Sequence, residues 1–294
     1  MRNRKLLIAG AASLALSIGI TSAAHAAVFQ GQSLVMSAQS GKQDKKKAGP
    51  IKGLVTDVIT TYTNSPPSAP DRYATNTKLY FPTDFRFNAA GLPQCANTPS
   101  FAGGTTANAL ALCGPAKVSS FGSANIEGAI PGVTAVVTAF NGQPSGGNPT
   151  LLLHSQSSAG PSLVLVGTLR NSDVGGFGKM LDVPVDLGPL QGTEAITDFK
   201  VGIPRVKLPF AKSQKKAFAK KRAKCKKVRS KGKRGKCLKN VNAKEKKVKQ
   251  RSYIMASCRT GKWSFQAIST YNTGGPTTAP ASLGCKQLKP KKKK

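Results

Sequence analysis

The stretch YIMASCRTGKWSFQAISTY, residues 253–271, indicates the fold class of this 294-residue chain most clearly. Two β-prone runs, YIMASC and WSFQAISTY, flank the short turn sequence RTGK. In the second run, one side of a strand would carry Trp263, Phe265, Ala267 and Tyr271, and the other Ser264, Gln266 and Thr270. This alternation predicts an antiparallel hairpin with one buried face and one solvated face.

The rest of the body has the same β-rich texture. Glycine occurs 30 times and proline 19 times, so short β-prone runs are separated by turn sequences such as NGQPSGGNP. The further candidate strands are residues 54–62, 78–83, 133–140, 150–156, 162–170, 179–187 and 196–203. About ten short strands favour two packed sheets. The sequence therefore predicts an all-β fold, an antiparallel two-sheet sandwich over residues 51–285.

The N-terminus has the pattern of a secretory signal peptide over residues 1–26. A basic start is followed by an apolar run from Leu6 to Ile20 and by an A-x-A cleavage site that ends at Ala26. The run is shorter than the roughly 20 residues that a membrane-spanning helix needs. We expect a mature chain that is secreted or associated with the cell wall, with no transmembrane segment after cleavage. Residues 27–50 would be an N-terminal segment and a lysine-rich linker.

The cysteine pattern agrees with export. The mature chain holds six cysteines, and an oxidising compartment favours disulfides between them. Zinc is the alternative, but no C-x-x-C pair occurs and His154 is the only mature histidine. Six cysteines allow 15 pairings. We expect pairing of sequence neighbours, because each such pair encloses a short loop or hairpin: Cys95 with Cys113, Cys225 with Cys237, and Cys258 with Cys285.

Charge is concentrated in the last third of the chain. Residues 27–208 hold 14 basic and 10 acidic residues, whereas residues 209–294 hold 28 basic residues and one acid, Glu245. The basic residues cluster in an insert at 211–251, which interrupts the body between two neighbouring strands, and in a tail at 286–294. Because blocks of like charge repel one another, the sequence predicts that the insert and the tail are mostly disordered.

The insert is the candidate binding site, and its expected ligands are polyanions. Export disfavours a histone-like or ribosomal role, so nucleic acid is expected to bind only non-specifically. The expected partners are anionic cell-wall or surface polymers, and the alternative is a solubilising segment with no dedicated partner. The candidate polyanion-binding residues are Lys220, Lys221, Arg222, Lys224, Lys226, Lys227, Arg229, Lys231, Lys233, Arg234 and Lys236.

One helix is expected around residues 98–118, beside a segment that resembles other proteins. The sequence LPQC…ALCGPAKVSSFGSANI (92–126), with the later YIMASCRTGKWSFQA…GC, resembles uncharacterised exported β-sandwich-type proteins of high-GC Gram-positive bacteria. The resemblance covers about half of the mature chain. This chain departs from the group's Cys-Pro and Gly-x-Gly elements, with Cys113-Gly114-Pro115 and Phe121-Gly122. The resemblance implies an exported β fold and no particular activity.

The sequence shows no catalytic constellation, so we expect no enzymatic activity, cofactor or metal. His154 alternates with leucines on a predicted strand, as structural histidines do, and no nucleophile elbow is present. Asp182 and Asp186 would lie about 13 Å apart on a strand, too far for a glycosidase pair. The main hypothesis is a non-enzymatic envelope or extracellular protein that its basic insert and tail hold on anionic polymers. The alternative is an exported carbohydrate-binding or hydrolytic domain, anchored to the wall by the basic loop, in which Trp263 and Tyr271 would line an exposed groove.

Overall fold

The structure, a computed structural model, describes residues 28–38, 49–50, 53–63, 70–130, 132–158, 160, 162–207 and 212–287. The predicted signal peptide, most of the lysine-rich linker and the tail after residue 287 lie outside these residues.

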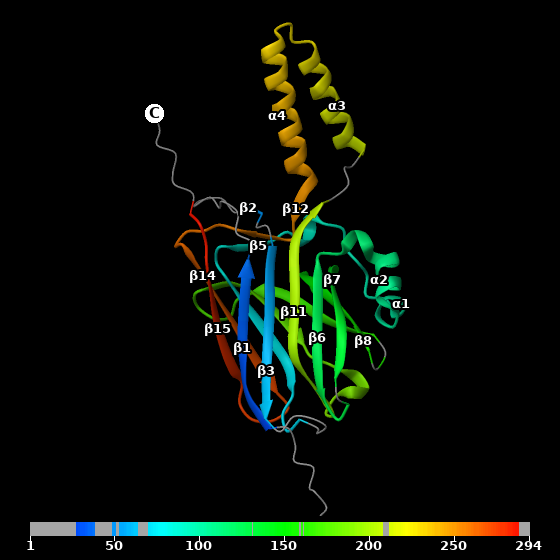
Figure 1. Ribbon diagram of the computed structural model, residues 1–294, viewed down its shortest axis with the longest axis vertical. Helices are drawn as coiled ribbons and strands as arrows, with labels where there is room; N and C mark the ends of the chain where they lie inside the picture. The colour runs from blue at the N-terminus through cyan, green and yellow to red at the C-terminus, as the bar shows by residue number, and fades with distance from the viewer. Residues whose placement is uncertain are drawn as a thin grey trace, which may run out of the picture.

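Eleven strands form one continuous antiparallel sheet (Figure 1). In spatial order they are β1 (Val28–Ala38), β3 (Gly53–Thr63), β11 (Glu194–Lys207), β6 (Phe121–Gly128), β7 (Val133–Ser145), β8 (Asn148–Ser157), β9 (Leu163–Asn171), β10 (Phe177–Pro184), β4 (Ala74–Pro82), β14 (Lys262–Tyr271) and β15 (Thr277–Gly284). Eight of the nine candidate strands match strands of this sheet, and the ninth, at 253–258, corresponds to β13 (Ile254–Ala256) of a second sheet. The predicted hairpin of 253–258 with 263–271 is wrong, because β14 pairs with β15 and β4, whereas β13 pairs with β2 (Gly49–Pro50) and β5 (Phe85–Phe87). The sequence did not predict β1, β6 and β15, and β1 belongs to the sheet rather than to a segment before it.

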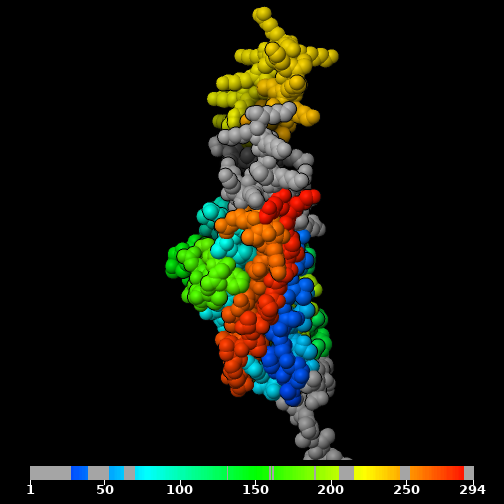
Figure 2. Space-filling view, turned by 90° about the vertical axis from the view of Figure 1, so that its left-hand side faces the viewer, coloured from blue at the N-terminus to red at the C-terminus, as the bar shows by residue number. Residues whose placement is uncertain are grey.

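The two edge strands of this sheet, β1 and β15, lie side by side (Figures 1 and 2). They share no backbone ladder within the described residues, and side chains of β1 and β14 join the seam. Gln32 Nε2 donates to Ser269 Oγ at 2.7 Å, and the Phe29 and Tyr271 rings meet with their centroids 4.8 Å apart. The Arg72 guanidinium lies over both rings. The sheet is therefore nearly closed into a barrel.

The predicted two-sheet sandwich is thus wrong. In a sandwich the strands divide into two sheets, whereas here each of the eleven strands pairs with the next and the sheet curls until its edges meet. Alternation in the sequence shows which face of a strand is buried, and that pattern is the same in a sandwich and in a barrel. The number of strands that pair before the sheet closes depends on long-range register, which single-strand patterns do not contain.

The barrel interior is a single apolar core, and several side chains of the stretch 253–271 belong to it. Trp263 and Ala267 are fully buried and Phe265 is nearly so, which confirms the predicted buried face of β14. The Trp263 indole packs edge-on against Phe85, with centroids 5.0 Å apart, and donates its Nε1–H to the carbonyl of Ser257 at 2.8 Å. The one polar atom of the largest core side chain is therefore satisfied.

A second, three-stranded sheet lies at one end of the barrel (Figure 1). Its order is β2 (Gly49–Pro50), β13 (Ile254–Ala256) and β5 (Phe85–Phe87). The side chains of Phe85 and Ile254 belong to the main core, so this sheet caps the barrel. At the same end, β12 (Gln250–Ser252) pairs with the last residues of β11.

The predicted helix around residues 98–118 is present as two short helices, α1 (Pro99–Ala102) and α2 (Thr106–Cys113). Thr98 and Thr105 cap them, each through a side-chain oxygen that accepts a backbone N–H. The helices cover the outer face of β7 and β8, where Phe101 packs edge-on against Phe140 with centroids 5.2 Å apart. Three short 3₁₀ turns are also present, at Ala89–Gly91, Gly114–Ala116 and Gly188–Leu190.

The basic insert is helical, so the prediction of a mostly disordered insert is wrong. It forms α3 (Lys212–Lys226) and α4 (Lys231–Lys249), an antiparallel pair that projects from the capped end of the barrel (Figures 1 and 2). The insert connects β11 to β12, which pair with each other, whereas the strand predicted to follow the insert, at 253–258, is β13 and pairs with β2 and β5. Lysine and alanine are good helix formers, and a disulfide holds the two helices together, so charge repulsion does not prevent folding.

Candidate polyanion-binding site

The helical hairpin, defined as residues 212–249, is the strongest concentration of charge in the described chain. It contains 19 basic residues and one acid, Glu245. By the rise of an α-helix, α4 alone is about 28 Å long, which is enough to reach several successive charges on a linear polymer. The hairpin is therefore the part of the structure suited to contact a polyanion.

A very small apolar seam joins the two helices. Phe218, Cys225 and Val241 are its buried members, and Cys237 and Leu238 pack against them. The Cys225–Cys237 disulfide links the end of α3 to the start of α4, with the Cα atoms 5.5 Å apart. The nearby Ala217 and Ala223 are exposed and add nothing to this seam. With so little burial, the disulfide carries a large share of the hairpin's stability.

The single acid of the hairpin lies on its inner side. Glu245 forms an ion pair with the Arg222 guanidinium, whose Nε also donates to Asn242 Oδ1 at 3.4 Å. This contact joins α3 to α4 beside the apolar seam. Arg222 was predicted to bind polyanions, but its guanidinium pairs with Glu245 and so links the two helices.

The other predicted binding residues are distributed over the outer surface of the hairpin. Arg234 is the exception, because it is half-buried. The exposed members of the predicted set are Lys220, Lys221, Lys224, Lys226, Lys227, Arg229, Lys231, Lys233 and Lys236. The Lys221 ammonium lies 5.4 Å from the centre of the Phe218 ring, close enough for a cation–π contact. The structure thus brings nine predicted cations together on one projecting element.

All six cysteines are paired, in the sequential pattern expected from the sequence. The disulfides join Cys95 to Cys113, Cys225 to Cys237 and Cys258 to Cys285. Three disulfides in one chain suggest an oxidising, extracellular or secretory location. No helix in the described part of the chain is both long and apolar enough to cross a membrane.

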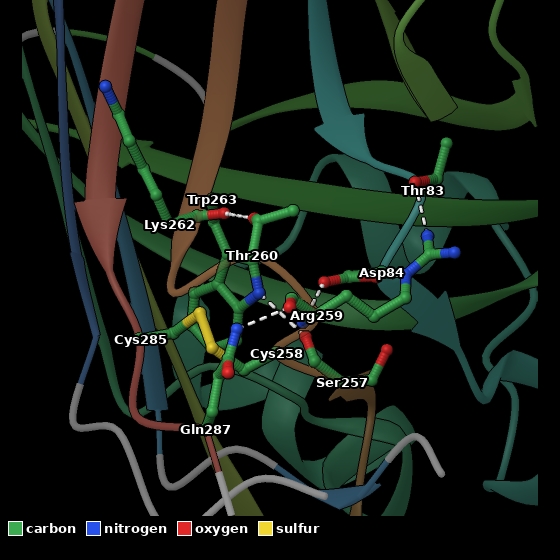
Figure 3. Close-up of polar contacts among 10 residues, drawn as sticks. All are labelled: Thr83, Asp84, Ser257, Cys258, Arg259, Thr260, Lys262, Trp263, Cys285 and Gln287. Atoms are coloured by element: carbon green, nitrogen blue, oxygen red, sulfur yellow. Dashed lines mark hydrogen bonds and ion pairs between the residues drawn. A yellow bond between two sulfur atoms is a disulfide. The ribbon is translucent and has the colours of Figure 1, made fainter. Parts of the chain in front are cut away.

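A polar network surrounds the Cys258–Cys285 disulfide at the start of β14 (Figure 3). The nearly buried Asp84 carboxylate accepts the Arg259 backbone N–H at 3.0 Å and pairs with the Arg259 guanidinium. The Asp84 carbonyl accepts the Ser257 N–H, also at 3.0 Å. These bonds hold the turn that precedes β14 against the end of β4. We interpret this network as structural, because its buried carboxylate is fully engaged within the chain.

The aromatic residues considered for sugar stacking are buried. Trp263 is inaccessible, and the Tyr271 ring is covered by Phe29 and by the Arg72 guanidinium, whose Cζ lies 4.2 Å from the ring centre. A sugar-binding platform needs an exposed ring face. These two rings therefore do not line the exposed groove that the carbohydrate-binding alternative requires.

His154 is a structural residue. It lies on the outer side of β8 beneath α1, is fully buried, and has its Nε2 3.0 Å from the Gly104 carbonyl oxygen. Its ring packs edge-on against Phe101. Within the described residues, no three histidine, cysteine or carboxylate side chains lie close enough together to hold a metal ion.

Sequence analysis missed one feature that has the properties of a site, a cavity of about 100 Å³ inside the barrel. Its walls come from strands spread over residues 32–203 and from Tyr253 and Ile254. No local motif marks such a cavity, because its lining residues look like ordinary core positions in every strand that contributes one.

Comparison of the chain with protein-family models, with characterised proteins and with solved structures finds no significant match. The resemblance to exported proteins of high-GC Gram-positive bacteria therefore stays a prediction.

Proposed function

We propose that this is an exported, non-enzymatic protein whose helical hairpin binds anionic polymers of the cell envelope or its surroundings. The observation that carries the proposal is that the basic insert is a folded element. Nine predicted cations stand on its outer surface, and a disulfide, a small apolar seam and one ion pair hold its helices together.

This architecture favours binding over simple solubilisation. A solubilising segment needs charge but no shape, and an unstructured lysine-rich loop would serve equally well. Here the chain closes a disulfide across a segment whose like charges oppose compaction. Holding the lysines on two short helices reduces the conformational entropy that is lost when they bind.

The electrostatic driving force is large enough for this role. Each lysine near an anionic surface contributes about 1 kcal/mol. Nine exposed cations therefore give useful affinity even when salt screening removes most of that energy. Flexible lysine side chains contact phosphate-like groups without directional readout, so binding should be insensitive to the sequence of the polymer.

The test compares two sets of four charge removals that leave the same net charge. The hairpin set is Lys220→Gln, Lys224→Gln, Lys231→Gln and Lys236→Gln. The control set lies on the exposed surface of the barrel and its ends: Arg86→Gln, Arg170→Gln, Lys262→Gln and Lys286→Gln. Binding is measured against salt for poly(glycerol phosphate) and for a DNA duplex of arbitrary sequence.

For the DNA duplex, the hairpin set should reduce the slope of log affinity against log salt by about 3.6, because four phosphate contacts are lost. The control set should leave the slope nearly unchanged. Equal effects of the two sets would show that net charge alone matters, and the hairpin would then be a solubilising element. For poly(glycerol phosphate), we expect the same ranking of the two sets.

A further inference from the structure

The cavity inside the barrel has properties that core packing alone does not explain. Its volume is about 100 Å³, and its walls are almost entirely apolar. Leu153, Leu169 and Phe199 are typical of the lining residues, and no lining side chain is charged. Interiors of proteins are normally packed with few voids larger than a water molecule. A void of this size in the middle of a barrel therefore lowers the stability of the fold. Larger side chains that filled it would remove this loss.

Two polar atoms at the cavity have no hydrogen-bond partner within the described chain. The Tyr253 hydroxyl belongs to a side chain that is 1% exposed, and Gln32 Oε1 is likewise buried. The other end of the Gln32 amide donates to Ser269 Oγ. Burial raises the pKa of Tyr253 above its usual value, so its hydroxyl remains a neutral donor at physiological pH. Leaving such groups unpaired is unfavourable.

Contacts of Tyr253 with its neighbours hold the unpaired hydroxyl at the cavity. Tyr253 stands between β12 and β13, its backbone carbonyl accepts the Asn88 N–H at 2.8 Å, and its ring packs edge-on against Phe87. These contacts fix the ring at the capped end of the cavity. A water molecule bound there would need two to four polar partners. Phe87, which packs against the ring, is apolar, and the other polar side chains of the lining are Gln32, Thr56, Thr60 and Thr77.

We propose that the cavity binds a small, neutral, mostly apolar molecule with one oxygen that accepts a hydrogen bond from the Tyr253 hydroxyl. The absence of charged lining residues in the described chain selects a neutral ligand. An engineered apolar cavity of about 150 Å³ in another protein holds benzene. The cavity here has about two thirds of that volume, so we expect a ligand of at most one small ring. This inference is independent of the polyanion-binding function.

The seam of the barrel provides a route for entry. β1 and β15 share no backbone ladder within the described residues, so separating them disrupts no strand pairing there. Gln32 takes part in the seam through its bond to Ser269 and also lines the cavity. Opening the seam at Gln32 would therefore connect the cavity to solvent.

Phenol and toluene are suitable probes because they differ by a hydroxyl in place of a methyl group. Binding of each to the full mature chain is measured by titration calorimetry and by ligand-observed NMR. We expect one site per chain, and phenol should bind about two- to tenfold more tightly than toluene because it accepts the Tyr253 hydrogen bond. Tyr253→Phe should abolish this preference while toluene affinity is retained.

Two further variants locate the binding. Tyr80→Phe removes a hydroxyl that bonds to Asp173 at 2.9 Å on the outer side of β4, and it should leave the phenol preference intact. Leu153→Phe fills the cavity and should reduce the affinity of both probes at least tenfold. Tyr253→Phe removes a single oxygen and carries the test alone if Leu153→Phe does not fold. The proposal is overturned if phenol does not bind, or if its preference survives Tyr253→Phe.

Discussion

In the barrel, 27 buried apolar residues form one continuous cluster, whereas the cluster of the helical hairpin has three buried members, Phe218, Cys225 and Val241. The barrel is thus stabilised by burial, in which the loss of one side chain is felt across many neighbours. The hairpin depends on one disulfide, one ion pair and the helix propensity of lysine and alanine. The difference shows that burial stabilises the body of this chain, whereas a few local links stabilise its insert.

The largest effect on stability should come from a substitution in the apolar core of the barrel. Trp263→Ala removes the largest fully buried side chain and its bond to Ser257, and should lower the free energy of unfolding by about 3–5 kcal/mol. The measurement is urea unfolding followed by near-ultraviolet circular dichroism. In this variant the Cys225–Cys237 disulfide of the hairpin should remain intact. A loss below about 1 kcal/mol would mean that the barrel core can collapse around the cavity.

A smaller and more local effect should follow removal of the Cys225–Cys237 disulfide. Closing a loop of this length contributes about 3 kcal/mol in the chain-entropy model, and the hairpin has little burial with which to replace it. Cys225→Ser with Cys237→Ser should therefore lower the helical signal in far-ultraviolet circular dichroism while the barrel's unfolding midpoint stays the same.

The matched control for that experiment is Cys95→Ser with Cys113→Ser. This pair removes the disulfide beside α1 and α2, which pack on the sheet through Phe101 and Phe140. It should shift the unfolding midpoint of the barrel and leave the hairpin helical. If the Cys225/Cys237 variant also destabilised the barrel, the two regions would not be independent.

The smallest predicted effect concerns two carboxylates on the outer side of β3 and β11. Burial, followed by the hydrogen bond with Asp57 and that residue's negative charge, raises the pKa of Asp198 above its usual value. The folded state then binds the Asp198 proton more tightly than the unfolded state, so stability decreases as pH rises through the interval between the two pKa values. Above this interval the cost is fully present, and below it the cost is absent.

Asp198→Asn should therefore raise the melting temperature slightly at pH 7 and leave it unchanged at pH 3. Lys200, whose ammonium lies 2.7 Å from Asp57 Oδ2, would keep its partner in this variant. Asp182→Asn is the control, because that carboxylate accepts a hydrogen bond from Asn76 Nδ2 at 2.8 Å. A melting temperature that fell at pH 7 in Asp198→Asn would show that the charged Asp198 stabilises the fold.

The sequence was informative wherever a local pattern determines the structure. The alternation around Trp263 correctly predicted the buried face of β14, and Phe199, Val201 and Ile203 line the barrel interior from one face of β11, as their spacing indicates. The paired glycines of the NGQPSGGNP turn adopt positive φ angles of 56° and 77° at Gly146 and Gly147, which a tight hairpin of this kind requires.

Local patterns do not predict how the barrel closes or how the sites form, because both depend on residues far apart in sequence. Gln32, Ser269 and Tyr271 join the seam across more than 200 residues, and nothing local indicates that β1 meets β14. The inner side of the hairpin was missed for a related reason. Arg222 has the appearance of a free cation in a basic run, and only the antiparallel docking of α4 brings Glu245 beside it.

The most direct test of the division between barrel and hairpin is deletion of the basic elements. Residues 212–249 are replaced by a short glycine–serine loop, which the pairing of β11 with β12 can accommodate, and the tail after residue 287 is removed. Retention on immobilised heparin is then measured against salt, together with the thermal unfolding of both proteins. We predict that retention is lost while the melting temperature of the barrel stays the same. Retention that survived both deletions would place polyanion binding on the barrel and contradict the proposed role of the hairpin.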